Sequence, residues 1–219
     1  MNRLDLFVFI HKGIRRILFD TTLKVAATDF SAGGEEILAA EAVARMLGFL
    51  ESHATDEDAI ILPEISELAP ELYIDLRAEH ARLEGLQSEI HGIVERLRTA
   101  NEPEAVSLGR RLSERLCSLT SLQLNHMARE ETEVNRVLWA HRTDPQLQLL
   151  RERILDRNTP EQLAEWYALS LPAMNALERR ILLSGLQAAM TQEQFERTTA
   201  SARAALGERK WLAALTALA

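Results

Sequence analysis

The chain has 219 residues and a formal net charge of −8, from 25 Lys and Arg against 33 Asp and Glu. This acidic balance excludes a general nucleic-acid-binding surface. The single cysteine, Cys117, excludes an internal disulfide framework and a cysteine-based zinc or iron–sulfur site.

Only nine glycines and six prolines occur, which disfavours a turn-rich β fold and favours long helices. No uncharged apolar stretch is long enough to span a membrane, and the first residues lack the pattern of a signal peptide. We therefore expect a soluble, cytoplasmic, mostly helical protein that binds neither nucleic acid nor membrane.

Breaks rich in Gly, Pro, Ser and Asn divide the chain into four long helical segments and a tail. The four helices are expected at residues 5–28, 35–67, 71–98 and 104–139. Pro63 is expected to kink or end the second of them. The tail is expected to form four or five shorter helices, one of them beginning at Thr191, which has capping-box spacing with Gln194.

Short connections between long helices predict an all-α, antiparallel up-down-up-down four-helix bundle with extra C-terminal helices. The bundle is expected to occupy residues 1–143. Residues 144–219 form a C-terminal helical extension that docks on the bundle or builds a dimer interface, because its apolar side chains must be covered.

Each long helix carries one histidine on the stripe of side chains that faces the bundle core. These histidines are His11, His53, His80 and His126. Two of the helices also place a glutamate four residues later on the same face, in His53-x-x-x-Glu57 and His126-x-x-x-Glu130. A buried glutamate is costly unless it is paired or bound to a metal.

In the expected topology, the four histidines lie at one level of the bundle. Each lies roughly 26 to 33 Å along its helix from the same end, at 1.5 Å per residue. A single histidine on an apolar stripe is more often an ordinary core residue with a hydrogen-bond partner. Four histidines and two glutamates converging in one layer instead favour a metal site.

This pattern resembles the hemerythrin-like family, also called the HHE cation-binding domain. The resemblance rests on His11, His53-Ala-Thr-Asp-Glu57, Glu79-His80 and His126-Met-Ala-Arg-Glu130, and it covers residues 1 to 141. It implies two non-haem iron ions joined by an oxo or hydroxo bridge, with manganese or zinc as chemical alternatives. It also implies that the four histidines are terminal ligands, and that Glu57 and Glu130 bridge the ions.

Glu84 is a departure from the pattern of the oxygen-carrying members. They have a second histidine four residues after the first on the third helix, where this chain has Glu84. Glu84 either ligates, which would make the site richer in carboxylate, or points to solvent. A site with fewer histidines is less like a reversible oxygen carrier and closer to oxidase-like or peroxide chemistry.

Three functions therefore remain open. The first is a diiron protein that binds, senses or detoxifies O2, peroxide or NO. The second is an iron-handling or storage protein without turnover, and the third is a metal-free helical interaction module. The sequence does not decide whether the protein is an enzyme, which small molecule it binds, or whether it forms a homodimer.

Several other residues have structural interpretations. His91 and His141 fall off the core stripes and are expected to face solvent. Cys117 is expected to be a small buried hydrophobic residue. Gln87 and Gln123 lie on core stripes, where they hydrogen-bond across the bundle or contact the metal ligands.

Overall fold

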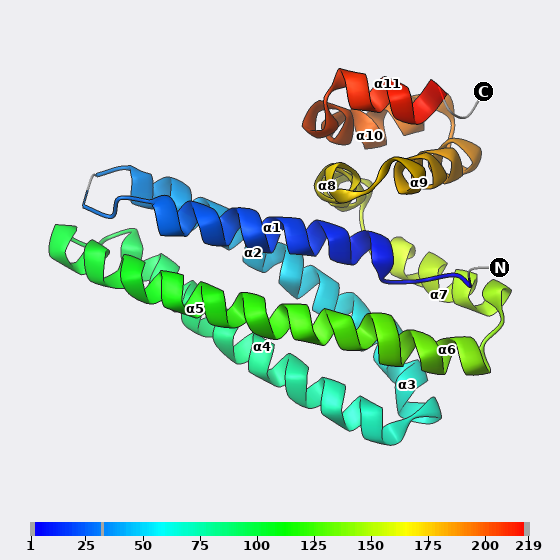
Figure 1. Cartoon of the computed structure of the whole chain (residues 1–219), viewed down its shortest axis with the longest axis horizontal. Coiled ribbons are helices and arrows are strands. Elements are labelled where there is room, and N and C mark those ends of the chain that lie inside the picture. The colour runs from blue at the N-terminus through cyan, green and yellow to red at the C-terminus, as the bar shows by residue number, and fades with distance from the viewer. Residues whose placement is uncertain (1–2, 32, 217–219) are drawn as a thin grey trace. The chain divides into compact units, whose positions relative to one another are not determined.

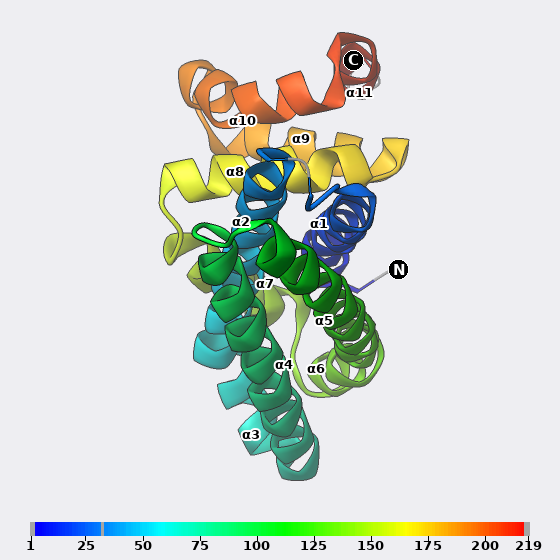
Figure 2. The same ribbon diagram turned by 90° about the vertical axis from the view of Figure 1, so that its left-hand side faces the viewer.

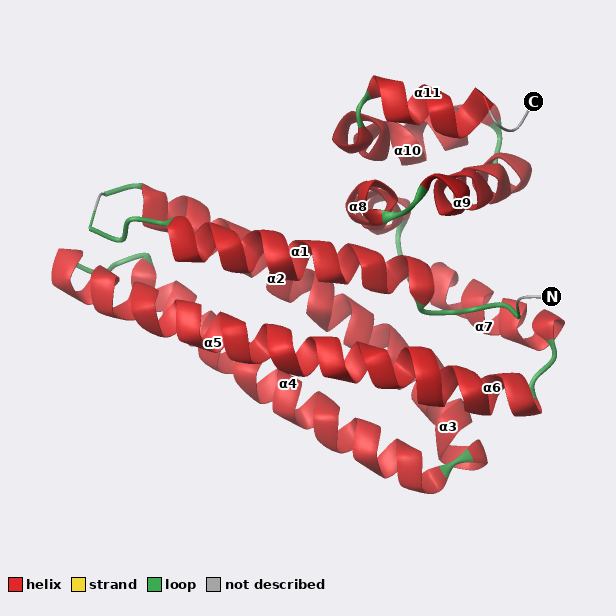
Figure 3. Ribbon diagram, in the orientation of Figure 1, coloured by secondary structure: helices red, strands yellow, loops and turns green. Residues whose placement is uncertain are grey.

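A computed structural model describes residues 3–31 and 33–216. All regular structure in these ranges is helical, and no strand occurs among them (Figure 3). The internal contacts of the described residues divide them into two compact units. The N-terminal unit contains Arg3 and Ile17–Gln146, and the C-terminal unit contains Leu4–Arg16 and the chain from Leu147 onward. Helix α1 (Val8–Ala27) therefore contributes to both units.

The N-terminal unit is a bundle of long antiparallel helices, as the sequence predicts (Figure 1). Besides α1 its helices are α2 (Glu35–Asp56), α3 (Leu62–Leu68), α4 (Pro70–Leu97), α5 (Glu102–Arg129) and α6 (Asn135–His141). Helices α4 and α5 pack against each other over their lengths, and α2 packs on α4 (Figures 1 and 2). A hydrogen bond of 3.1 Å between Thr22 and Thr120 joins the second half of α1 to α5.

Local sequence signals explain where these helices begin and which faces they bury. The side chain of Asn101 accepts a hydrogen bond from the backbone N–H of Glu104, which caps α5. Pro70 occupies the first turn of α4, where its missing N–H costs nothing. Every third or fourth side chain of α5 is buried, including Leu112, Leu116 and Leu119, and this stripe forms part of the core.

Two π-helical turns interrupt the bundle at matching places. The turn η1 (Glu57–Ile61) joins α2 to α3, and η2 (Glu130–Val134) joins α5 to α6. Each begins at the glutamate of a His-x-x-x-Glu pair. Pro63 falls in the first turn of α3, so the break expected there is a change from π to α geometry rather than a helix end. Single π-helical turns occur frequently at functional sites.

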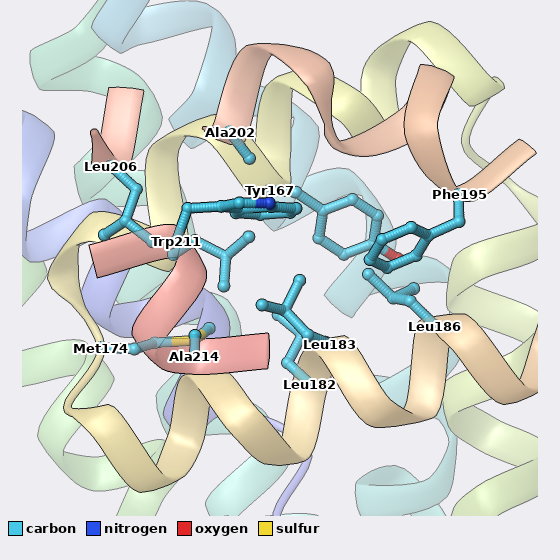
Figure 4. Close-up of a cluster of buried hydrophobic side chains, with 11 residues drawn as sticks. Tyr167, Met174, Leu182, Leu183, Leu186, Phe195, Ala202, Leu206, Trp211 and Ala214 are labelled. Atoms are coloured by element: carbon cyan, nitrogen blue, oxygen red, sulfur yellow. The ribbon is translucent and has the colours of Figure 1, made fainter. Parts of the chain in front are cut away.

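The C-terminal unit has a hydrophobic core of its own. Its helices are α7 (Asp144–Asp156), α8 (Pro160–Ser170), α9 (Ala176–Ala189), α10 (Gln192–Leu206) and α11 (Glu208–Thr216), with a 3-10 turn η3 (Leu171–Ala173). Leu183, Phe195 and Trp211 lie within its core (Figure 4). The expected cap at Thr191 is present as a complete capping box with Gln194.

The first half of α1 belongs to this C-terminal unit and contacts α8 and α9. Lys12 Nζ lies 2.6 Å from both carboxylate oxygens of Glu178. Gly13 lies so close to α8 that an added Cβ would come within 2.5 Å of Ser170 Oγ. The division into domains at residue 143 remains a prediction, because α1 connects the two units.

One prediction about an individual side chain is wrong, since Cys117 is exposed. It follows Leu116, which is fully buried, and a step of one residue turns a side chain about 100° around the helix. Within the described ranges, no helix has both the length and the apolar character that crossing a bilayer requires.

Candidate metal centre

The four stripe histidines and the two glutamates are all buried. Their exposed fractions lie between 0% and 6%. By contrast, His91 and His141 are exposed, as the stripe assignment predicts. The structure thus separates the six histidines of the chain into four interior side chains and two surface ones.

His80 on α4 and His126 on α5 face each other. Their Nε2 atoms lie 3.0 Å apart. The Nδ1 atom of His80 lies 2.8 Å from an oxygen of Asp58, and that of His126 lies 2.7 Å from an oxygen of Glu79. Because a carboxylate only accepts, both Nδ1 atoms carry the proton and donate it. Both Nε2 lone pairs then point to one place, an arrangement that a cation stabilises.

Two arginines hold the carboxylates that orient these histidines. Arg77 donates to Asp58 over 2.7 Å, and Arg129 donates to the second oxygen of Glu79. Hydrogen bonds to Glu133 and Glu79 raise the pKa of Arg129 above its ordinary value, so the guanidinium stays charged. A carboxylate that fixes the tautomer and orientation of an imidazole is the usual support of a metal-bound histidine.

The two glutamates lie next to the Nε2 atoms of the histidines. An oxygen of Glu57 is 3.1 Å from His53 Nε2, and an oxygen of Glu130 is 3.2 Å from His126 Nε2. The other oxygen of Glu57 is 3.7 Å from His80 Nε2. The i,i+4 spacing, from α2 into η1 and from α5 into η2, therefore directs each glutamate towards the same interior region as its histidine.

Burial and the neighbouring charged groups together shift the pKa values of these side chains. Burial, followed by the neighbouring Glu130 carboxylate, raises the pKa of Glu57 well above its ordinary value. Burial and the adjacent His126 lower the pKa of His80. Burial also opposes the charged form of His126, but Glu130 and Glu79 outweigh it and raise the pKa of that side chain. A metal ion that binds here must therefore displace protons.

The donor atoms form two groups that share both glutamates. One group contains Glu57, His80, His126 and Glu130, with donor atoms all within 4.8 Å of one another. The other contains His11, His53, Glu57 and Glu130, within the same limit. A mixed imidazole and carboxylate set of this kind suits iron, and also manganese or zinc.

A cavity of about 200 Å³ adjoins the first group. His53, Glu57, His80 and His126 lie on its wall, together with polar residues of α2, α4 and α5. Glu84 also lines this cavity, but it is exposed and belongs to neither donor group. Ligation by Glu84 thus has no support among the donor groups of the described residues.

A family model for the hemerythrin HHE cation-binding domain matches residues 2–138, which is more than half of the chain. The chain belongs to the hemerythrin HHE family. The match spans every ligand-type residue discussed above, so the resemblance that the sequence motifs suggest is confirmed. No curated protein matches the sequence. Family membership and the buried histidine–glutamate cluster together indicate metal binding.

Sequence reasoning missed the residues that support the histidines of this hemerythrin-type site. Asp58 and Glu79 each follow or precede a recognised ligand-type residue in the chain, yet each contacts a histidine of another helix. The sequence contains one indication of this supporting role, which is that the two carboxylates are next to Glu57 and His80 in the chain. Spacing along one helix cannot reveal a hydrogen bond between two helices.

We expect Glu79→Ala to weaken metal binding by about 10- to 100-fold, because His126 loses the acceptor that orients its ring. Glu89→Ala is the matched control, since Glu89 is a carboxylate of the same helix that pairs with Arg115, outside the site. Competition with a chelator measures the affinity for Fe(II) in both variants. Equal weakening in the two variants, or none in Glu79→Ala, would contradict the orienting role.

Proposed function

We propose that this protein holds two non-haem iron ions in the bundle and uses them to bind, sense or detoxify O2, peroxide or NO. The observation that supports two ions is that Glu57 and Glu130 belong to both donor groups. Two carboxylates shared between two pairs of histidines are suited to bridging two ions. In this assignment His11 and His53 serve one ion, and His80 and His126 serve the other.

Bound iron would supply a redox-active centre to which small oxygen or nitrogen ligands coordinate. The protein's own residues orient the donor atoms and shape the space beside them. Asp58 and Glu79 hold the protons of His80 and His126 on Nδ1 and leave both Nε2 atoms free to bind metal. The buried bundle core keeps the six donors in place, and the adjoining cavity gives a small molecule room beside them.

The cavity also bears on the choice among reactions. Its wall includes carboxylate and amide side chains rather than apolar groups alone, so the space beside the donors is polar. A polar, carboxylate-containing site suits irreversible reaction with an oxidant better than reversible oxygen carriage. We therefore place sensing or detoxification ahead of oxygen transport.

Iron handling without turnover is the second candidate. The exposed carboxylates on the same cavity favour it, since they suit the capture of a cation. A metal-free interaction module is the least favoured, because two glutamates buried side by side, with the pKa of Glu57 raised, have no role in it.

The deciding experiment loads the protein with Fe(II) under anaerobic conditions and measures the iron content. We expect about two iron ions per chain, given the number and type of donors. The loaded protein is then exposed separately to O2, hydrogen peroxide and NO while its optical spectrum is recorded. A ligand-dependent spectrum supports the proposed function, and an unchanged spectrum with all three supports iron handling. Failure to bind Fe(II) would overturn both.

A further inference from the structure

The cavity beside the donor group is lined by three helical segments of the N-terminal unit. Four ligand-type side chains lie on its wall: His53, Glu57, His80 and His126. Its other lining residues include Glu51 and Thr55 from α2, Glu84 and Gln87 from α4, and Gln123 from α5. The cavity thus joins exposed polar side chains to the buried donors.

Two carboxylates lie on the exposed part of this wall. Glu51 belongs to α2 and Glu84 to α4, and both side chains are exposed. Neither lies within 4.0 Å of a cationic side chain in the part of the chain that the structure describes. The third carboxylate outside the donor group, Asp58, is held by Arg77 and His80. Glu84 interacts with the charge of Arg77 from a greater distance, and Arg77 makes its ion pair with Asp58. Neither Glu51 nor Glu84 is therefore held in an ion pair at the surface.

Gln123 supplies an independent observation on the interior part of the wall. Its side chain is 3% exposed, lines the cavity, and lies on α5 one turn before His126. No hydrogen bond joins its amide to another side chain or to the backbone in the described ranges. An amide side chain on the wall of a polar cavity is a suitable ligand for a passing cation.

We propose that this cavity is the uptake route for Fe(II). Glu51 and Glu84 attract the hydrated ion at the surface, and the amide oxygen of Gln123 replaces one of its water ligands on the way to His80 and His126. This inference rests on the proposed iron function. It assigns Glu84 to capture of the ion rather than to the final ligand set.

Electrostatics explain why such a route would favour cations. The chain has a net charge of −8, and a cleft lined by one sign of charge concentrates counter-ions within it. Focusing of this kind raises association rates by about 10- to 1,000-fold and weakens as salt is added. Capture and final binding are therefore separable, since one sets the rate of loading and the other its extent.

The test compares metal-free wild-type protein with the double variant Glu51→Gln/Glu84→Gln and with Gln123→Met. Fe(II) is added anaerobically, samples are quenched with a chelator at short times, and the protein-bound iron is measured. Co(II), followed by its d–d absorption, gives an independent readout without oxidation. Glu41→Gln/Glu71→Gln is the control, because these exposed carboxylates lie on the same two helices but not on the cavity.

We expect the double variant to load at least about tenfold more slowly than wild type at low salt, and to reach the same final stoichiometry. Gln123→Met should also load more slowly, and the control should load like wild type. Added salt should slow wild type more than the double variant. Wild-type loading rates in the double variant would overturn the route. A lower final stoichiometry in the double variant would also overturn it, because one of the two carboxylates would then be a ligand. Absence of iron in wild type itself would instead refute the proposed function.

Discussion

Replacing His126 or Glu130 with alanine is expected to remove at least half of the iron from the protein. Both side chains are buried in the donor cluster, and Glu130 belongs to both donor groups. The iron content should fall from about two ions per chain to about one in His126→Ala, and further in Glu130→Ala, because the shared carboxylate serves both ions. Iron analysis of each variant, after expression in iron-replete medium, measures the effect.

His91→Ala and His141→Ala are the matched controls for these variants. Both histidines are exposed, and His91 lies on α4, the helix that also carries His80. We expect the iron content of both controls to equal that of wild type. Circular dichroism should show that every variant is still helical. Equal iron loss in His91→Ala would contradict the orientation of α4 on which the site assignment depends.

Removal of the metal is expected to destabilise the fold strongly. The carboxylates of Glu57 and Glu130 are 4% and 2% exposed, and without a cation they repel each other in the core. A metal present at about 1,000 times its dissociation constant stabilises a protein by about 4 kcal/mol. For a chain of this size, that corresponds to a fall in Tm of about 8 to 16 °C after chelation.

Thermal unfolding of loaded and chelated protein measures this difference. The control is the same comparison on Glu130→Ala, in which chelation should change Tm little because little metal is bound. Equal Tm values for loaded and chelated wild-type protein would show that metal binding does not stabilise the fold. The burial of the two glutamates would then no longer be an argument for a metal centre.

The core stripes were readable from the sequence because a helix of 3.6 residues per turn brings positions three and four apart to one face. This periodicity placed His80 and His126 inside the bundle and His91 outside it, and the structure confirms all three placements. It fails after the π-helical turn η2. Continued from Glu130 and Val134, the core stripe predicts Val137 as the next buried side chain, but Leu138 is buried instead, because η2 contains a wider turn than an α-helix.

The sequence by itself indicated the helical class, the four long helices and, through its resemblance to known members, the family. Spacing within single helices predicted that the four histidines and two glutamates lie in the core. Only the tertiary structure decided that Asp58 orients His80 and that Glu79 orients His126. It alone also placed Gln123 on a cavity and Glu84 outside the donor groups. These contacts depend on how the helices pack against one another. The spacing of apolar residues within one helix carries no information about which residue of another helix it will contact.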